Sequence, residues 1–131
     1  MTDRFTILDA PEEFLSAPLR LTVDLSAIAE NWREMARRSG SARTAAVVKA
    51  DAYGLGTRWI APALATAGID AFAVSTLTEA CELHSLGITA PVYLLSPATP
   101  AEQSAVVATQ HGAASPIIPA VASEEDAIQY A

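Results

Sequence analysis

The stretch Ala45–Gly56 reads AAVVKADAYGLG and decides the fold. Its first four residues are small or β-branched and apolar, which is typical of a buried strand, and Gly54 and Gly56 then turn the chain toward a helix. Lys49 stands where the predicted strand ends. Because an ammonium group is costly to bury, this side chain must either extend its amine past the rim of the sheet or be held uncharged for chemistry.

The composition of the chain favours a chemical role for Lys49. It is the only lysine among the 8 basic residues, and the others are arginines. Arginine easily replaces a surface lysine, but it cannot replace an amine that must lose its proton and condense with a carbonyl. On spacing alone, the alternative of a lysine at a strand end with its amine in solvent stays open.

Length, charge and cysteine usage exclude several classes of protein. At 131 residues the chain is expected to form one domain. The net charge of -7 argues against binding to a phosphate backbone, so no nucleic-acid partner is expected. A single cysteine, Cys81, fits a reducing compartment. The N-terminus lacks a signal-peptide pattern and no stretch approaches the ~20 apolar residues of a membrane span, so we expect a cytoplasmic protein without membrane contact.

The chain before the Lys49 stretch contains one expected strand and one expected helix. Residues 1–18 mix acidic residues with proline and are expected to form a flexible extension. A half-buried strand is expected from Leu19 to Asp24, with Leu19, Leu21 and Val23 on one face. A helix that Ser26 caps and that ends near Gly40 is expected to follow.

The chain from Ala45 onward repeats a short apolar strand followed by a capped helix. The expected strands are 45–48, 71–75, 92–95 and a short one around 117–118. The expected helices are 57–67, one opened by a capping box at Thr76–Glu79, one opened at Thr99–Glu102 and one that begins after Ser123. Pro62 is expected to disturb the helix 57–67. Such alternation predicts parallel strands covered by helices. An open doubly wound sheet and a barrel both satisfy it.

The residues Val48–Gly56 closely resemble the cofactor-attachment motif of alanine racemases, which are pyridoxal-phosphate (PLP) enzymes with a barrel fold. Many members carry Asn at the position of Asp51 and His at that of Leu55. Further similarity covers Val23–Leu25, Phe72–Val74 and Glu79–Ala80. The resemblance implies an α/β fold, a parallel (β/α)8 barrel. Because such a barrel needs roughly 250 residues, residues 19–131 are expected to hold only about its first half, roughly four βα units, incomplete at the C-terminus.

The resemblance also implies the site residues. In the family, the lysine matching Lys49 forms the internal aldimine with PLP and acts as one of two catalytic bases, and the tyrosine matching Tyr53 reaches the cofactor phosphate. The opposite base is a tyrosine from the C-terminal domain of the partner subunit, and nothing in this chain matches it or the family's cofactor-contacting arginines. No metal site is expected, because Cys81 and His84 are interpreted as ordinary helix residues.

The function implied by the resemblance is PLP-dependent interconversion of L-alanine and D-alanine, which in bacteria supplies D-alanine for peptidoglycan, with a homodimer for the full-length enzyme. The 131-residue chain by itself is expected to be inactive, and its open sheet edges are expected to cause aggregation or association. Two alternatives stay open: another barrel-type PLP enzyme, such as a serine racemase or an amino-acid decarboxylase, and a non-catalytic PLP-binding or interaction module.

Overall fold

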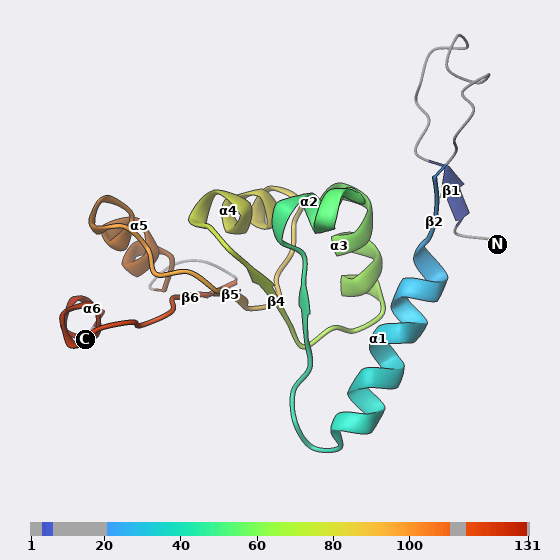
Figure 1. The fold of residues 1–131 in the computed structure, drawn as a ribbon, viewed down its shortest axis with the longest axis horizontal. Helices are drawn as coiled ribbons and strands as arrows, with labels where there is room; N and C mark the ends of the chain where they lie inside the picture. Colours follow the sequence, from blue (N-terminus) through green and yellow to red (C-terminus); the bar gives the residue numbers. More distant parts are fainter. Residues whose placement is uncertain (1–3, 7–20, 111–114, 131) are drawn as a thin grey trace, which may run out of the picture.

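The computed structural model describes residues 4–6, 21–110 and 115–130 of the chain. The elements follow the order β1 (Arg4–Thr6), β2 (Thr22–Asp24), α1 (Leu25–Ser39), β3 (Ala45–Val47), α2 (Lys49–Gly54), α3 (Thr57–Thr66), β4 (Ala71–Val74), α4 (Leu77–Ser85), β5 (Val92–Leu94), α5 (Pro100–Gln110), β6 (Ile117–Ile118) and α6 (Glu124–Gln129). Figure 1 shows these units following one another across the molecule, from α1 on one side to α6 on the other.

The main sheet has 4 strands in the order β3-β4-β5-β6, all parallel. Each strand therefore lies beside the strand that precedes it in sequence, and helices form the connections. A doubly wound sheet reverses its strand order at a switch point, whereas a barrel adds each new strand on the same side. The strand order thus confirms the expected part of a (β/α) barrel and decides between the two folds that the periodicity left open.

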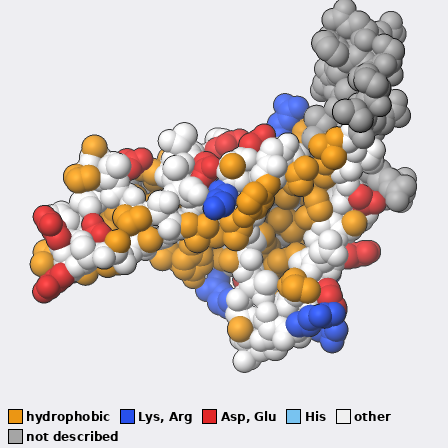
Figure 2. Space-filling view, viewed as in Figure 1, with side chains coloured by type: hydrophobic (Ala, Val, Ile, Leu, Met, Phe, Trp, Pro, Cys, Tyr) orange, Lys and Arg blue, Asp and Glu red, His pale blue; other side chains and the backbone are white. Residues whose placement is uncertain are grey.

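The two faces of the main sheet differ in how well they are covered. One row of paired residues comprises Ala46, Phe72, Val92 and Ile117, and the last three are fully buried. The neighbouring row contains Val47 and Tyr93, whose side chains are 41% and 36% exposed. The interpretation of residues 45–48 as a buried strand was therefore wrong for Ala45 and Val47, since only the other face of β3 packs under helices. Figure 2 shows hydrophobic side chains gathered in a band across the middle of the molecule.

The first strand and helix begin differently from the prediction. Leu21 is 56% exposed whereas Val23 is buried, so the two do not share a buried face, and Leu19 lies outside the described residues. Helix α1 starts at Leu25 and not after Ser26, because the carboxylate of Asp24 accepts the N–H of Ala27 at 3.1 Å. The Ser26 hydroxyl donates to that same carboxylate.

The segment 1–18, expected to be an extension, is only partly described. Its residues Arg4–Thr6 form β1, which pairs antiparallel with β2, with Phe5 opposite Val23. The other residues of this segment lie outside the described ranges, as do residues 111–114, which follow α5.

The later helices begin where their capping residues predicted. Thr76 and Glu79 form a complete capping box at α4, and Ser123 caps α6 by accepting the N–H of Asp126. Helix α3 continues through Pro62 without the expected disturbance. The missing proline N–H removes one hydrogen bond, and burial of Ile60, Ala61 and Leu64 on the core side of α3 outweighs that loss.

The core lies between the main sheet and its helices. Its largest fully buried side chains include Phe72 from β4, Leu83 from α4, Val106 from α5 and Ile117 from β6. Trp32 of α1 packs against this core, and its indole N–H donates to the carbonyl of Thr44 at 3.1 Å. Among the described residues, no helix combines the length and the apolar character needed to cross a bilayer.

Candidate functional site

Lys49 lies at the carboxyl end of β3. The ladder between β3 and β4 extends one residue past the strand, because the N–H of Val48 donates to the carbonyl of Ala73 at 2.9 Å. Val48 is buried in the core, and Lys49 is the first residue beyond it, half-buried. Parallel strands end at one edge of a sheet, and in barrel enzymes this edge carries the active site. The position of Lys49 is thus the one that its predicted role requires.

The four residues after Lys49 form a left-handed turn. Ala50, Asp51, Ala52 and Tyr53 have φ of 52, 54, 52 and 58° with ψ of 52, 50, 48 and 36°. This conformation costs L-residues roughly 1–2 kcal/mol each, so four in succession need support from their surroundings. The sequence predicted a turn at Gly54 and Gly56 and gave no sign of this earlier one, since alanine has no preference for a left-handed backbone.

Hydrogen bonds on both sides hold the left-handed turn in place. The N–H of Ala52 donates to the carbonyl of Val48 at 3.0 Å, and the N–H of Gly56 donates to the carbonyl of Asp51 at 2.9 Å. The Asp51 carboxylate accepts the N–H of Thr57, the first residue of α3, at 2.6 Å. Thr57 is buried, so the turn is tied to a fixed point of the core.

Glu79 supports the turn from the neighbouring βα unit. Its Oε1 accepts the N–H of Ala50 at 2.7 Å, while its Oε2 accepts the N–H groups of Ser75 and Thr76 at the start of α4. Burial raises the pKa of this carboxyl, but the hydrogen bonds from the backbone of Ala50, Thr76 and Ser75 and from the Thr76 hydroxyl outweigh burial and hold the pKa below the usual range of glutamate. The capping box signalled the contacts at α4, and nothing in the sequence signalled the contact with Ala50.

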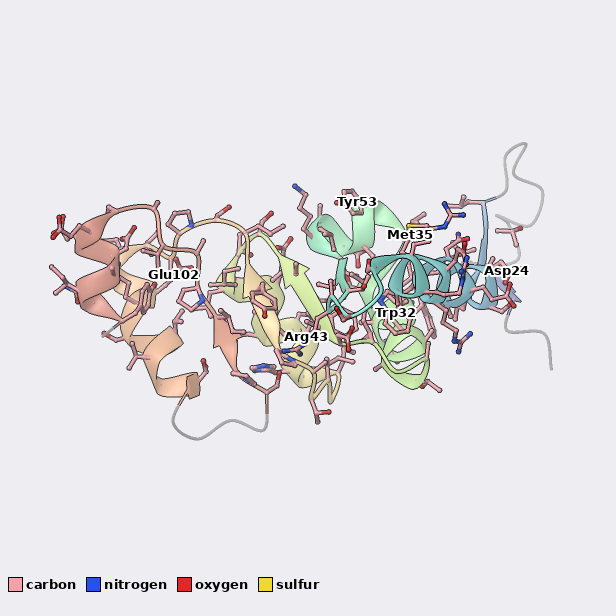
Figure 3. All side chains as sticks on the ribbon, turned by 90° about the horizontal axis from the view of Figure 1, so that it is seen from below. Asp24, Trp32, Met35, Arg43, Tyr53 and Glu102 are labelled. Carbon is pink, nitrogen blue, oxygen red and sulfur yellow. The ribbon has the colours of Figure 1, made fainter. Side chains whose placement is uncertain are left out.

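Tyr53 is the last residue of the left-handed turn and is 62% exposed. Figure 3 shows it at the edge of the molecule, on α2. The turn thus presents the Lys49 amine and the Tyr53 phenol on one short segment. An amine can condense with an aldehyde, and a phenol can donate a hydrogen bond to a phosphate oxygen. This pair of groups fits the two ends of PLP, which carries one aldehyde and one phosphate.

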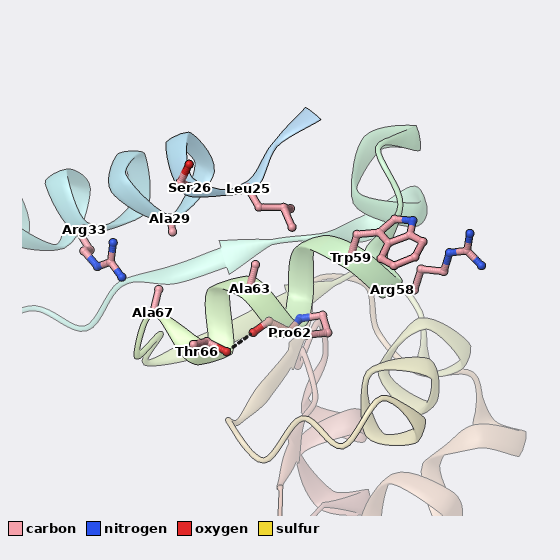
Figure 4. A pocket seen from close by; sticks show the side chains of 10 residues that line it. All are labelled: Leu25, Ser26, Ala29, Arg33, Arg58, Trp59, Pro62, Ala63, Thr66 and Ala67. Atoms are coloured by element: carbon pink, nitrogen blue, oxygen red, sulfur yellow. Dashed lines mark hydrogen bonds between the residues drawn. The ribbon is translucent and has the colours of Figure 1, made fainter. Parts of the chain in front are cut away.

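A separate hollow lies between α1 and α3, away from this pair of side chains. Its volume is about 610 Å³, and neither Lys49 nor Tyr53 lines it. Leu25, Ala29 and Ala63 are among its apolar lining residues, and Figure 4 shows Arg33 and Arg58 toward its two ends. The Arg58 guanidinium lies over the ring of Trp59, 4.5 Å from the ring centroid.

Comparison with known proteins assigns the family. The family described as alanine racemase, N-terminal domain, matches residues 23–131. The chain belongs to the alanine racemase family. The match begins at β2 and includes the Lys49 stretch and all 4 strands of the main sheet.

Individual alanine racemases agree with this assignment. The biosynthetic alanine racemase of Agrobacterium fabrum is 46% identical over 114 residues, which cover 87% of this chain and 28% of that protein. The alanine racemase of Rhizobium meliloti is 55% identical over 84 residues, which cover 64% of this chain and 22% of that protein. The chain thus spans about a quarter of the length of these relatives.

A solved alanine racemase supports the fold. The crystal structure of the Bartonella henselae enzyme, which has covalently bound pyridoxal phosphate, superimposes with a TM-score of 0.62 at 35% identity. The match covers 66% of this chain and 26% of that one. The sheet of this chain accordingly has the fold of part of the N-terminal barrel domain found in the alanine racemase family.

Proposed function

We propose that this chain supplies the cofactor-attachment part of a PLP-dependent alanine racemase, an isomerase that interconverts L-alanine and D-alanine. The observation that carries the proposal is the position of Lys49, the only lysine of the chain, at the carboxyl edge of the sheet, directly before the left-handed turn that bears Tyr53. The covalently bound pyridoxal phosphate of the Bartonella henselae relative supports the choice of cofactor.

The residues of this chain would divide the work as follows. Lys49 would hold the cofactor through its amine, and Tyr53 would donate its phenol hydrogen to the phosphate. PLP, when bound, supplies the electron-withdrawing ring that stabilises the charge left when an amino acid loses its α-proton. Once the substrate amine has displaced the Lys49 amine, the freed Lys49 amine would act as the base on one face of the substrate. It would remove or return the α-proton of the D-enantiomer. A second base on the opposite face would have to come from outside the described residues.

The proposal also covers the oligomeric state, the location and the substrate of the enzyme. We expect a homodimer in the cytoplasm, because the opposite base in this family comes from the partner subunit, and we expect its D-alanine to serve peptidoglycan synthesis. Alanine rather than serine is proposed as substrate, since the A. fabrum and R. meliloti relatives are named alanine racemases.

Borohydride trapping tests this proposal directly. The reagent reduces the C=N bond between an aldehyde and an amine to a stable secondary amine, and Lys49 and the N-terminus are the only primary amines in residues 1–131. Treatment of the full gene product with PLP and borohydride should place the adduct on the peptide that contains Lys49, and Lys49→Arg should abolish it while keeping the positive charge. A folded protein with no adduct on Lys49 would refute every PLP-dependent function.

An activity measurement then separates the substrates. The full gene product with PLP should convert L-alanine to D-alanine faster than it converts L-serine to D-serine, and Lys49→Arg should lose both activities. A preference for L-serine would replace alanine racemase by serine racemase, and release of carbon dioxide would indicate a decarboxylase. A protein that forms the Lys49 adduct and converts none of these amino acids would be a non-catalytic PLP-binding module.

A further inference from the structure

The carboxylate of Glu79 joins two consecutive βα units. Its Oε2 lies 2.8 Å from the N of Ser75 and 3.0 Å from the N of Thr76, and these contacts close the start of α4. Its Oε1 lies 2.7 Å from the N of Ala50, the residue that follows Lys49, although 29 positions separate Ala50 from Glu79 in the sequence. One side chain therefore holds both a helix start and the peptide group next to Lys49.

The contact with Ala50 is not a requirement of helix capping. Glu102 occupies the same position in α5, three residues after Thr99, and its Oε2 accepts the N–H and the hydroxyl of Thr99 at 2.9 and 2.6 Å. Within the described residues, the hydrogen bonds of Glu102 stay within its own unit. Capping alone thus needs only local contacts, and the reach of Glu79 to Ala50 is an additional feature.

The contacted N–H lies in the peptide group between Lys49 and Ala50. The left-handed turn begins at this group, since Ala50 has φ of 52° and Lys49 does not have positive φ. A hydrogen bond from that N–H to a charged oxygen is directional and strong, so it fixes the orientation of the peptide plane. The peptide group on the other side of Lys49 is also held, because the carbonyl of Val48 accepts the N–H of Ala52 at 3.0 Å. With both peptide planes that meet at the Cα of Lys49 held, the direction of its Cα–Cβ bond is set.

We infer that Glu79 is a positioning residue for Lys49: by holding the Ala50 N–H, it sets the peptide plane from which the Lys49 side chain extends and thereby aims the Lys49 amine at the PLP aldehyde. This inference rests on the proposed function of Lys49. Glu79 acts through the backbone and does not touch the cofactor. Its two oxygens divide the roles, with Oε2 serving α4 and Oε1 serving Ala50.

Glu79→Gln separates these two roles. Glutamine also occurs at this capping-box position, so its single amide oxygen can still accept the two N–H groups at the start of α4. Its NH2 group then faces the Ala50 N–H, and because both groups are donors, no hydrogen bond forms between them. Glu102→Gln is the matched control, because it makes the same chemical change at a helix start without a contact to Ala50. Glu79→Ala and Glu102→Ala form a second matched pair in case the new amide rotates.

Two readouts in the full gene product test the inference. The first is hydrogen exchange of the Ala50 amide without PLP, which should become at least tenfold faster in the Glu79 variants. The second is the rate at which added PLP becomes borohydride-stable on Lys49, which should fall at least fivefold in the Glu79 variants. Both Glu102 variants should stay within twofold of the unmodified protein in each readout.

The possible failures are distinct. If the Glu79 variants match their Glu102 counterparts in Ala50 exchange, or if they take up PLP as fast as those counterparts, Glu79 does not position Lys49. An unmodified protein that takes up no PLP at Lys49 would overturn the proposed function, and the exchange of Ala50 would still report whether the hydrogen bond forms.

Discussion

The Asp51 carboxylate accepts a hydrogen bond from the N–H of Thr57 at 2.6 Å, so a residue inside the left-handed turn caps the helix that follows it. Asp51→Ala removes this acceptor and should lower the free energy of unfolding by about 1 kcal/mol, the usual effect of losing a helix cap. Asp51→Asn keeps an oxygen acceptor, and asparagine tolerates a left-handed backbone, so its effect should stay within about 0.5 kcal/mol. Urea unfolding of the two variants measures the difference.

The outcome of that comparison identifies what Asp51 contributes. If Asp51→Asn destabilises the protein as much as Asp51→Ala, the negative charge matters and the acceptor oxygen alone does not suffice. The resemblance already suggests the opposite, because many alanine racemases carry asparagine at this position.

The two glycines that end the Lys49 stretch should respond differently to substitution. Gly54 and Gly56 both have positive φ, of 79 and 97°. A Cβ on Gly56 would lie 2.9 Å from Cδ1 of Trp59, whereas a Cβ on Gly54 would meet no atom within 4 Å. Gly54→Ala should therefore cost only the backbone strain, roughly 1–2 kcal/mol, and Gly56→Ala should cost more because the indole must also move. Thermal unfolding of both variants checks the order, and equal costs would show that Trp59 moves freely.

The pH dependence of the Ala50 contact follows from the ionisation of Glu79. The pKa of Glu79 lies below its usual range in the folded chain, despite burial that acts to raise it, because backbone N–H groups hold the carboxylate. A lowered pKa means that the stabilisation is fully present above about 4.3, the ordinary value of glutamate, and is lost as the pH falls through the lower folded value. The amide resonance of Ala50 should accordingly shift with a midpoint below that ordinary value.

A matched signal is available at α5. Hydrogen bonds from the hydroxyl and the N–H of Thr99 also hold the pKa of Glu102 below its usual range. The Thr99 amide should therefore report the Glu102 titration, and Glu79→Gln should remove the transition at Ala50 while leaving that at Thr99. If the pH transition of the Ala50 amide persists in Glu79→Gln, a group other than Glu79 causes it.

Local signals in the sequence predicted much of this structure. The helix starts at Thr76 and Ser123 were correct because a cap and its partner lie three residues apart and need no distant contact. The four strands of the sheet were also found, because strands in a parallel sheet are short and largely apolar. The exposure of Val47 was missed, since coverage of a strand face depends on elements far away in the sequence.

The candidate site could be located from the sequence, but its geometry could not. Lys49 and Tyr53 were named from the motif, and the structure places both at the carboxyl edge of the sheet. The left-handed turn between them has no signature in the residues Ala50 and Ala52, which prefer other conformations. Part of its support comes from Glu79, 29 positions away from Ala50, and such a contact cannot be read from spacing.

Tyr53 provides the last prediction, because its proposed role depends on one hydroxyl group. The ring is 62% exposed at the end of the left-handed turn, so Tyr53→Phe should leave the fold unchanged. A hydrogen bond to a charged group contributes roughly 1.5–3 kcal/mol, so loss of a phosphate contact should weaken PLP binding roughly tenfold or more. Tyr93→Phe is the control, since it removes the same group from the middle of β5, below the edge where Lys49 lies. If both variants bind PLP equally well, in an equilibrium titration of the full gene product, Tyr53 does not hold the phosphate and the left-handed turn serves Lys49 alone.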